Sequence, residues 1–533
     1  MGRFLNPGNK AFQKTLKSEI YVDKTMLLAY TNKVIGSDMA CICNSRPRRF
    51  GKSITANMLA AYYSRGCDSL DMFSTLKVGR LDSFETNLNK YDVIHIDVQW
   101  CMMDAGEVQN TVKYINNGIL DELIIAYGDV IPDTVKTAYG AMSYINAATG
   151  NTFVIIIDEW DVLIRDEANN KELQEEYINF LRGMFKGTEP TKYIALAYLT
   201  GILPIKKLKT QSALNNFEEF TMLDAGALAS YIGFTDDEVR ELCDRYDMDF
   251  EEARAWYNGY KLVSHSKYGV KKYAMYSPKS VVEAMLKHKF GTYWNQTETY
   301  EALKVYIQMN MDGLKDAVIK MLAGESEKIN TGTFENDMTS FATKDDVLTL
   351  LVHLGYLTYD SETEEVSIPN REVSKEYLNA ISTMDWDEVS KSIKASQKLL
   401  ESLWNMNGAA VADGIDKAHN EISILRYNDE NSLSCTINLA FYSAREYYSI
   451  VRELPTGKGF ADVCFIPRVS HLDKPAVVIE LKYDKNVDGA ISQIKSRQYV
   501  EALKDYKGNL LLVGINYDKK TKEHQCVIEK WKL

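Results

Sequence analysis

The sequence predicts an α/β fold whose N-terminal part is built around a parallel β-sheet. Within the first 200 residues, short apolar runs alternate with segments of helical spacing, which is typical of strand–helix units in a parallel sheet. A second stretch of alternating helices and strands fills residues 421–533, after a largely helical middle. Because 533 residues exceed what one hydrophobic core normally accommodates, we expect several domains.

Four apolar runs mark the expected strands of the first domain, residues 1–205. The run Val154-Ile155-Ile156-Ile157 is continuous, as expected for a strand buried on both faces of a parallel sheet. A segment of helical spacing follows the first run. The expected strands are residues 39–43, 93–98, 153–158 and 193–201.

Three further domains are expected after residue 205. Strand signals fade over residues 206–330, where helical patterns predict a helical lid or connector. Residues 331–384 contain a helix, two strands around a polar turn and another helix, which is the order of a winged-helix-like module. Residues 385–533 begin with polar helices and continue as an α/β domain. Its expected strands are residues 463–467, 476–483 and 510–517.

Composition limits the classes of function. The chain is 45% hydrophobic and 26% charged with a net charge of −12, so any contact with nucleic acid requires a local basic patch. The N-terminus has no apolar run after its basic residue, and no stretch approaches the length of a membrane span. The eight cysteines are scattered, which predicts reduced thiols. We therefore expect a cytoplasmic protein without a membrane partner.

A basic loop lies between the first expected strand and the helix that follows it. Residues 44–53 read NSRPRRFGKS. Gly51-Lys52-Ser53 matches the end of a phosphate-binding loop, in which the lysine contacts the outer phosphates and the hydroxyl contacts Mg²⁺. The helix N-terminus also favours an anion there. Arg46, however, occupies the position of the first glycine in the usual G-x-x-x-x-G-K-[ST] pattern.

Polar residues end the third and fourth expected strands. Asp158 ends the third strand, which we expect to be adjacent to the strand before the loop, and would hold the Mg²⁺ shell together with Ser53. Glu159 follows and would polarise the attacking water. Thr200 ends the fourth strand, where a polar side chain can sense the γ-phosphate. The sequence thus predicts a nucleotide site with Mg²⁺.

Two charged residues interrupt an apolar strand near the C-terminus. Period-two alternation places Glu480 and Lys482 on one face of this strand, and Asp462 lies on the strand before it. Two carboxylates suit a hard divalent ion such as Mg²⁺ or Mn²⁺, and a neighbouring lysine can hold or activate water. Such a centre hydrolyses phosphodiester bonds, so nucleic acid, with DNA favoured, is the expected partner.

Five sequence blocks, in order, resemble the bacterial AAA-ATPase-like family, whose members commonly carry a PD-(D/E)XK nuclease-like domain at the C-terminus. The resemblance covers almost the whole chain. The blocks are YVDKT at 21–25, SRPRRFGKS at 45–53, IIIDEWD at 155–161, LTGILPI at 199–205 and WYNGY at 256–260.

In this family R-P-R-R-F-G-K-S is the normal form of the loop, so the resemblance implies an ATP site despite the missing glycine. Pro47 pre-sets a turn in the glycine's place. Arg48 and Arg49 have two open roles, which are contact with phosphate oxygens and pairing with a neighbouring domain or a subunit of a homo-oligomer. The loop residues assigned to the nucleotide are Arg46, Pro47, Arg48, Arg49, Phe50, Gly51, Lys52 and Ser53.

The PD-(D/E)XK resemblance assigns Asp462 as the first acid and Glu480 with Lys482 as the E-x-K, although alanine precedes Asp462 where proline is usual. It also adds residues on the flanking helices. Glu430 matches the acid of the first core helix, and Gln493 matches the glutamine of the helix after the E-x-K strand. The alternatives to Glu430 are Glu446 and Glu453, and the residues expected near backbone phosphates are Lys495 and Arg497.

The sequence therefore predicts a protein that binds and hydrolyses ATP and carries a metal-dependent nuclease domain. The alternative belongs to another class, a nucleotide-switched regulatory or scaffolding protein whose nuclease-like domain binds without cutting. The acidic net charge favours this alternative. The intact set of Asp462, Glu480 and Lys482 favours the nuclease.

Overall fold

The computed structural model describes most of the chain, as two compact units. The first comprises residues 1–297 and 328–373, and the second comprises residues 298–327 and 374–533. The boundaries of the four expected domains stay a prediction. The described residues are 2–205, 214–267, 269–294, 300–309, 311–336, 338–384, 386–421, 430–456, 459–485, 487–496 and 509–531.

The first unit contains a parallel five-stranded sheet with the order β2-β3-β4-β1-β5. All four expected strands are confirmed, and β5 is additional because three residues give no sequence signal. The expectation that β3 is adjacent to β1 is wrong, since β4 lies between them. The strands are β1 (Cys41–Ser45), β2 (Asp92–Asp97), β3 (Phe153–Asp158), β4 (Ile194–Gly201) and β5 (Glu218–Phe220).

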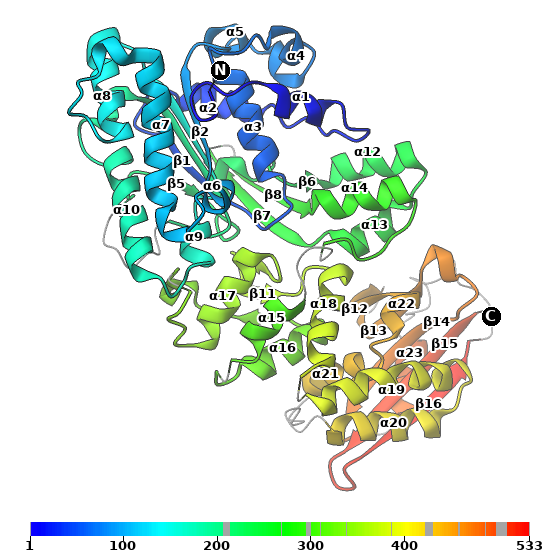
Figure 1. Cartoon of the computed structure of the whole chain (residues 1–533). Coiled ribbons are helices and arrows are strands. Elements are labelled where there is room, and N and C mark those ends of the chain that lie inside the picture. Colours follow the sequence, from blue (N-terminus) through cyan, green and yellow to red (C-terminus); the bar gives the residue numbers. More distant parts are fainter. Residues whose placement is uncertain are drawn as a thin grey trace. The chain divides into compact units, whose positions relative to one another are not determined.

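Helices cover both faces of this sheet (Figure 1). Alternate residues of β3 point to opposite faces, so Ile155 and Ile157 pack on one helical layer while Val154 and Ile156 pack on the other. The first layer contains α6 (Val98–Asp104), α7 (Thr111–Tyr127), α8 (Ala138–Thr149), α9 (Val162–Arg165), α10 (Lys171–Phe185) and α11 (Pro190–Tyr193). The second contains α1 (Lys10–Leu16), α2 (Leu27–Val34), α3 (Lys52–Tyr63), α4 (Leu70–Ser74) and α5 (Phe84–Asn87).

The segment expected as a helical lid also contains a small antiparallel sheet with the order β6-β8-β7. Its hairpin strands are rich in lysine, serine and tyrosine and are only partly buried, so they lack the apolar run by which we identified the other strands. Thr235 and Glu238 form a capping box at the start of α12. The elements are β6 (Phe234–Thr235), α12 (Asp236–Tyr246), α13 (Phe250–Tyr257), β7 (Tyr260–Ser266), β8 (Gly269–Tyr276) and α14 (Pro278–Lys287).

The order helix, strand, strand, helix that the sequence predicts for the winged-helix-like segment is confirmed. Thr343 and Asp346 form a capping box at the start of its first helix, which ends at Gly355 in the left-handed region with φ 87°. The elements are α17 (Lys344–Leu354), β10 (Thr358–Asp360), β11 (Glu365–Ser367) and α18 (Arg371–Ser382), and the short β9 (Glu327–Lys328) extends the hairpin.

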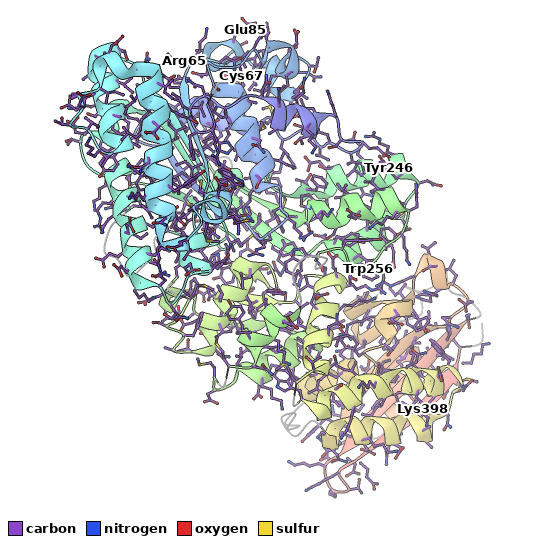
Figure 2. All side chains as sticks on the ribbon, in the orientation of Figure 1. Arg65, Cys67, Glu85, Tyr246, Trp256 and Lys398 are labelled. Atoms are coloured by element: carbon purple, nitrogen blue, oxygen red, sulfur yellow. The ribbon has the colours of Figure 1, made fainter. Side chains whose placement is uncertain are left out.

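The WYNGY block joins the lid to this segment. The guanidinium of Arg371 lies 4.5 Å from the ring centroid of Trp256, which is labelled in Figure 2. Gly259 approaches the backbone of Pro369 so closely that a Cβ could not be accommodated. The hydroxyl of Tyr260 donates to the carbonyl of Gly355 over 2.8 Å. The block is therefore a structural junction.

The second unit contains a mixed sheet with the order β12-β13-β14-β15-β16, in which only β14 and β15 run parallel to each other. The three expected strands are confirmed, and the more polar β12 and β16 are additional. The strands are β12 (Tyr448–Thr456), β13 (Gly459–Pro467), β14 (Ala476–Tyr483), β15 (Leu510–Asp518) and β16 (Glu523–Lys530).

Helices lie on both faces of the mixed sheet. Ile479 and Leu481 of β14 pack in the core formed with α19, α20 and α21, while Val478 packs in a smaller core beneath α23. Among the described helices, none is long and apolar enough to cross a membrane. The helices of this unit are α15 (Tyr300–Ile307), α16 (Leu314–Leu322), α19 (Asp387–Trp404), α20 (Gly408–Glu421), α21 (Glu430–Ala440), α22 (Ala444–Tyr447) and α23 (Val487–Ser496).

Candidate nucleotide and metal sites

The basic loop of the first unit folds around its lysine. Gly51 lies in the left-handed region with φ 95°, a conformation that only glycine adopts without strain, and α3 begins directly after it. Lys52 is only 4% exposed, and its Nζ donates to the carbonyl of Pro47 over 3.2 Å. The ammonium group is thus held inside the loop at the N-terminus of a helix, where an anion is favoured.

A cavity of about 720 Å³ opens beside this loop. Its loop wall includes Arg48, Arg49, Phe50, Lys52 and Ser53, and Glu159 also reaches it. The apolar side chains that line it come from the N-terminal segment, from the start of the lid and from α14. They include Ile20, Tyr21, Val22, Ile232, Phe234, Val282 and Leu286, and Phe12, Ile54 and Met58 of α1 and α3 line it as well. The cavity therefore has a charged part and an apolar part, as a phosphorylated ligand with an aromatic base requires.

The YVDKT block forms part of this apolar side. Lys24 donates to Glu238 over 2.5 Å and to the carbonyl of Ser230 over 2.9 Å, so it fastens the N-terminal segment to the lid. Asp23 accepts from the backbone and hydroxyl of Thr25. Burial, the largest cause, lowers the pKa of Lys24 although Glu238 opposes it.

The strand ends bring the predicted polar residues to one edge of the sheet. The register pairs Asn44 with Thr200 and Thr200 with Asp158, so the threonine lies between the loop strand and the acidic strand. Burial raises the pKa of Asp158 to about 6, and the neighbouring Ser53 hydroxyl opposes this shift. Ser53 and Asp158 are thus close enough to share one Mg²⁺ shell. The side chain of Thr200 is buried, with 1% of its surface exposed.

Glu159 lies in the left-handed region with φ 52° and faces two cations. Its Oε1 is 3.5 Å from Lys52 Nζ, and its Oε2 is 3.7 Å from Nη1 of Arg165. A non-glycine residue in this backbone region is uncommon and is often found at functional sites. The carboxylate is therefore placed beside the phosphate-binding lysine.

Arg46 does not reach the cavity. Its side chain is fully buried, and Nη1 donates to the carbonyls of Ser45 and Phe220 over 2.9 and 3.0 Å. Burial lowers its pKa to about 10. Arg46 thus braces the loop against β5, in place of the nucleotide contact that the sequence predicts.

Pro47 and Phe50 shape the loop from outside. Pro47 packs against Gly355, where a Cβ would lie 2.7 Å from the proline ring. The rings of Phe50 and Tyr260 are 5.1 Å apart, and the carbonyl of Phe50 accepts from Gly233. Of these two residues, only Phe50 also lines the cavity.

Two residues next to the acidic strand end were missed by sequence reasoning, Asp161 and Arg165. Arg165 is 6% exposed and pairs with Asp161 over 3.1 Å and with Asp166 over 2.9 Å. Burial alone would lower the pKa of Arg165, but the three neighbouring carboxylates raise it. The available signal was the charged residues at i and i+4 around the apolar Val162-Leu163-Ile164.

In the second unit, four predicted residues come together. Antiparallel pairing of Val463 with Ile479 makes Asp462 and Glu480 the next positions on their strands, and Asp462 Oδ2 accepts from the backbone of Leu481 over 2.7 Å. Glu480 is 1% exposed, and its Oε1 accepts from Lys482 over 2.8 Å and from Gln493 of α23.

The carboxylates of Asp462 and Glu480 fit a hard divalent ion. Magnesium is commonly bound through one or two carboxylates, with water and substrate phosphates completing the shell. No cluster of three or more metal-ligating side chains occurs within the described ranges, where this site offers two carboxylates. Asp462 and Glu480 would hold the ion beside Lys482.

Two of the remaining predicted residues, Glu446 and Lys495, lie on the surface. Glu446 is exposed on α22, and Lys495 pairs with Glu529 over 2.6 Å on the surface. Glu430 begins α21, but its side chain, that of Glu453 and the whole of Arg497 lie outside the described residues.

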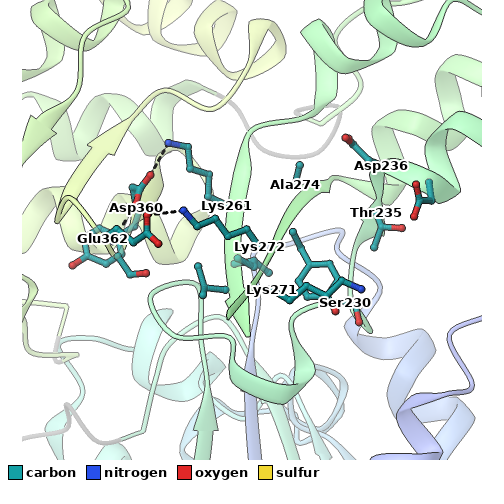
Figure 3. A pocket seen from close by; sticks show the side chains of 15 residues that line it. Ser230, Thr235, Asp236, Lys261, Lys271, Lys272, Ala274, Asp360 and Glu362 are labelled. Carbon is teal, nitrogen blue, oxygen red and sulfur yellow. Dashed lines mark hydrogen bonds and ion pairs between the residues drawn. The ribbon is translucent and has the colours of Figure 1, made fainter. Parts of the chain in front are cut away.

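A second hollow, of about 540 Å³, lies between the lid hairpin and the β10–β11 turn (Figure 3). Lys261 and Lys272 reach across it to Asp360 and Glu362 over 2.9 and 2.6 Å. These ion pairs are largely exposed, and such pairs contribute little stability. The mixture of charges matches no catalytic constellation, so we interpret the hollow as part of the contact between lid and winged-helix-like segment.

Two regions of the chain match known families. Residues 8–210 match the family described as Predicted AAA-ATPase, and residues 428–531 match the PD-(D/E)XK nuclease superfamily. The chain thus combines an AAA-ATPase-like domain with a C-terminal domain of the PD-(D/E)XK nuclease superfamily. These are the two domain types that the sequence blocks resemble.

One curated relative matches the chain at low sequence identity. An uncharacterized protein in the vnfD 5′ region of Azotobacter chroococcum mcd 1 is 26% identical over 263 residues, which cover 48% of this chain and 47% of that protein. The chain therefore matches about half the length of this curated relative.

Two solved structures are also similar, at 9% identity. Cdc6p from Pyrobaculum aerophilum matches with a TM-score of 0.26, over 71% of this chain and 99% of that chain. The ORC2 protein from Aeropyrum pernix, solved as ADPNP–ADP complexes, matches with a TM-score of 0.27, over 69% of this chain and 98% of that chain.

Proposed function

We propose that the chain binds and hydrolyses ATP in its first unit and cuts phosphodiester bonds of nucleic acid in its second. The observation that carries the proposal is the convergence of two polar sets. Lys52, Ser53 and Asp158 meet beside a cavity large enough for a nucleotide, and Asp462, Glu480 and Lys482 meet on a mixed sheet. Membership of the two domain families supports both halves.

In the first unit, the phosphates would lie at the N-terminus of α3. Lys52 would leave the carbonyl of Pro47 for the outer phosphates, and Arg48 and Arg49 line the same part of the cavity. Ser53 and Asp158 would hold Mg²⁺, which neutralises charge on the phosphates when bound. Glu159 would orient the attacking water, and Thr200 would contact the γ-phosphate.

In the second unit, Asp462 and Glu480 would hold a divalent ion, which stabilises the charge that develops on the phosphate. Lys482 lies on the same face of β14 as Glu480 and would hold the attacking water. Gln493 hydrogen-bonds Glu480 and would orient its carboxylate. We propose nucleic acid, with DNA favoured, as the substrate.

ATP turnover and nucleic-acid cleavage by the purified chain test the two halves separately. ATP hydrolysis that falls in Glu159→Gln while ATP still binds would support the first half. Cleavage of DNA or RNA with Mg²⁺ or Mn²⁺ that disappears in Glu480→Gln would support the second. Turnover that is unchanged in Glu159→Gln would exclude the assigned role of this glutamate.

A second candidate function is a nucleotide-switched protein whose nuclease-like domain binds nucleic acid without cutting. One observation favours it: the two proposed metal ligands already accept hydrogen bonds from the protein. Asp462 accepts from Leu481, and Glu480 accepts from Lys482 and Gln493. Nucleic-acid binding without cleavage under any metal condition, unchanged in Glu480→Gln, would favour this candidate.

A further inference from the structure

Arg165 lies outside the nucleotide loop but reaches the glutamate beside it. It ends the short helix α9, and its guanidinium is almost completely buried. Nη1 of Arg165 is 3.7 Å from one carboxylate oxygen of Glu159, and Nζ of Lys52 is 3.5 Å from the other. Each oxygen of Glu159 therefore faces a different cation.

Asp161 fixes the position of Arg165. Its Oδ2 accepts from Nη1 of Arg165 over 3.1 Å, while Nε of the same guanidinium donates to Asp166 over 2.9 Å. A planar guanidinium that is held at two edges has little rotational freedom. The direction of Nη1 towards Glu159 is therefore determined by the protein rather than by a ligand.

Asp161 also ties this arginine to the end of β4. The same Oδ2 accepts from the backbone N–H groups of Ile202 and Leu203 over 3.1 and 2.9 Å. Gly201 has to be a glycine here, because a Cβ would lie 2.4 Å from Asp161 Oδ1. Arg165 is thus linked through one buried carboxylate to the segment that follows Thr200.

Nucleotide binding would change which cation pairs with Glu159. Lys52 is the residue proposed to move to the outer phosphates, and it would then leave Glu159 Oε1. Among the ion pairs of the described residues, Arg165 is the other cation at Glu159. Nη2 of Arg165 is buried and has no hydrogen-bond partner, so the guanidinium retains one unused donor.

We propose that Arg165 is a positioning residue of the ATPase site, which holds Glu159 in place for water activation once Lys52 has moved to the phosphates. Asp161 connects this positioning to the strand end that carries Thr200. The inference rests on the proposed ATP hydrolysis and extends it to residues that contact neither phosphate nor metal. Arg165 acts on the orientation of Glu159, so it affects turnover and not ATP affinity.

Steady-state ATPase kinetics of the full chain, together with equilibrium binding of ATP, test this role. Arg165→Ala should lower kcat about 10- to 100-fold, because a displaced catalytic group loses most of its contribution. The Kd for ATP should stay within about threefold, since no phosphate contact is removed. Arg165→Lys should recover part of kcat, because it retains the charge but not the fork.

Arg182→Ala is the matched control, because Arg182 lies on α10 and bonds Asn179 away from the site. It should leave kcat and KM unchanged. A wild-type kcat in Arg165→Ala would overturn the inference. A fall in kcat that comes with an equal loss of ATP affinity, and that Arg165→Lys does not restore, would overturn it as well. A wild-type chain that binds but never hydrolyses ATP would instead overturn the proposed ATPase function.

Discussion

The nucleotide site and the nuclease-like site arrange similar charges in different ways. At the first, Lys52 and Glu159 face each other over 3.5 Å beside a cavity of about 720 Å³. At the second, Lys482 and Glu480 are in direct contact at 2.8 Å, with Gln493 on the same carboxylate oxygen. The first set is arranged around space for a ligand, whereas at the second Oε1 of Glu480 already accepts from two side chains before a metal or substrate arrives. A ligand therefore enters open space at the first site, whereas a metal that used Oε1 of Glu480 at the second site would compete with Lys482 and Gln493.

Breaking the pair in the second unit should have the largest effect on stability. Lys482→Met leaves the Glu480 carboxylate buried without its cation, which should destabilise this unit by about 3 kcal/mol. Chemical denaturation checks this value. The double variant Glu480→Gln/Lys482→Met should recover most of the loss, and Lys519→Met in an exposed turn should change nothing. Equal stability of Lys482→Met and wild type would show that the pair is not tightly coupled.

Asp158→Asn should stabilise the first unit at neutral and alkaline pH when nucleotide and Mg²⁺ are absent. Burial raises the pKa of Asp158 from 3.8 to about 6, so the folded state binds an extra proton between these values. Stability contributed by the protonated acid is therefore lost as the pH rises from 3.8 to 6. At pH 8 the asparagine variant should be more stable by about 2 to 3 kcal/mol.

The gain in Asp158→Asn should disappear below pH 4, where the native acid is protonated as well. Thermal or urea unfolding at pH 8 and pH 4 measures the difference, with exposed Asp38→Asn as the control. A variant less stable than wild type at pH 8 would contradict the assignment. The same variant should lose Mg²⁺-dependent ATP turnover, so stability and activity would change in opposite directions.

Lys52→Ala tests whether the open site is a nucleotide site. Loss of a charged hydrogen-bond donor to phosphate should weaken ATP binding about 10- to 100-fold. Titration calorimetry with a non-hydrolysable ATP analogue measures the change. Lys33→Ala, in which an exposed lysine at the end of α2 is removed, should bind as wild type does. Equal affinity of Lys52→Ala and wild type would place the phosphates elsewhere.

The smallest expected effect lies at the WYNGY junction behind the loop. Tyr260→Phe removes the hydrogen bond to Gly355 but keeps the ring against Phe50, so it should lower the free energy of unfolding by about 1 kcal/mol. ATP affinity should be unchanged, because the ring still supports the loop. A large fall in affinity would show that the hydroxyl itself positions the nucleotide loop.

The elements that the sequence predicted well are those with a strong local signal. The apolar runs gave four parallel strands, and Gly51-Lys52-Ser53 gave the start of α3. The short β5 and the polar hairpin of β7 and β8 lack such a run and were missed. The position of β4 between β1 and β3 depends on strand pairing across the whole sheet, which local periodicity does not encode.

In the candidate sites too, the sequence predicted residues that belong to a local motif but not contacts between distant residues. Motif spacing predicted Lys52, Asp158, Asp462 and Glu480, because the expected chemistry depends on residue type at fixed positions, and their roles stay a prediction. Motif position alone assigned Arg46 to the nucleotide, whereas its guanidinium is buried against the carbonyl of Phe220, which lies far away in sequence. The contact of Arg165 with Glu159 likewise depends on a backbone conformation at φ 52° that no sequence pattern specified.

A cleavage assay that crosses variants of the two sites shows whether the chain has two separate centres. DNA and RNA are incubated with Mg²⁺ or Mn²⁺, with and without ATP, and with wild type, Asp462→Asn, Lys52→Ala and the exposed control Asp473→Asn. We predict that Asp462→Asn abolishes cleavage but retains ATP turnover, while Lys52→Ala loses ATP turnover and keeps its metal-dependent centre. Cleavage that persists in Asp462→Asn, or ATP turnover that disappears with it, would contradict the account.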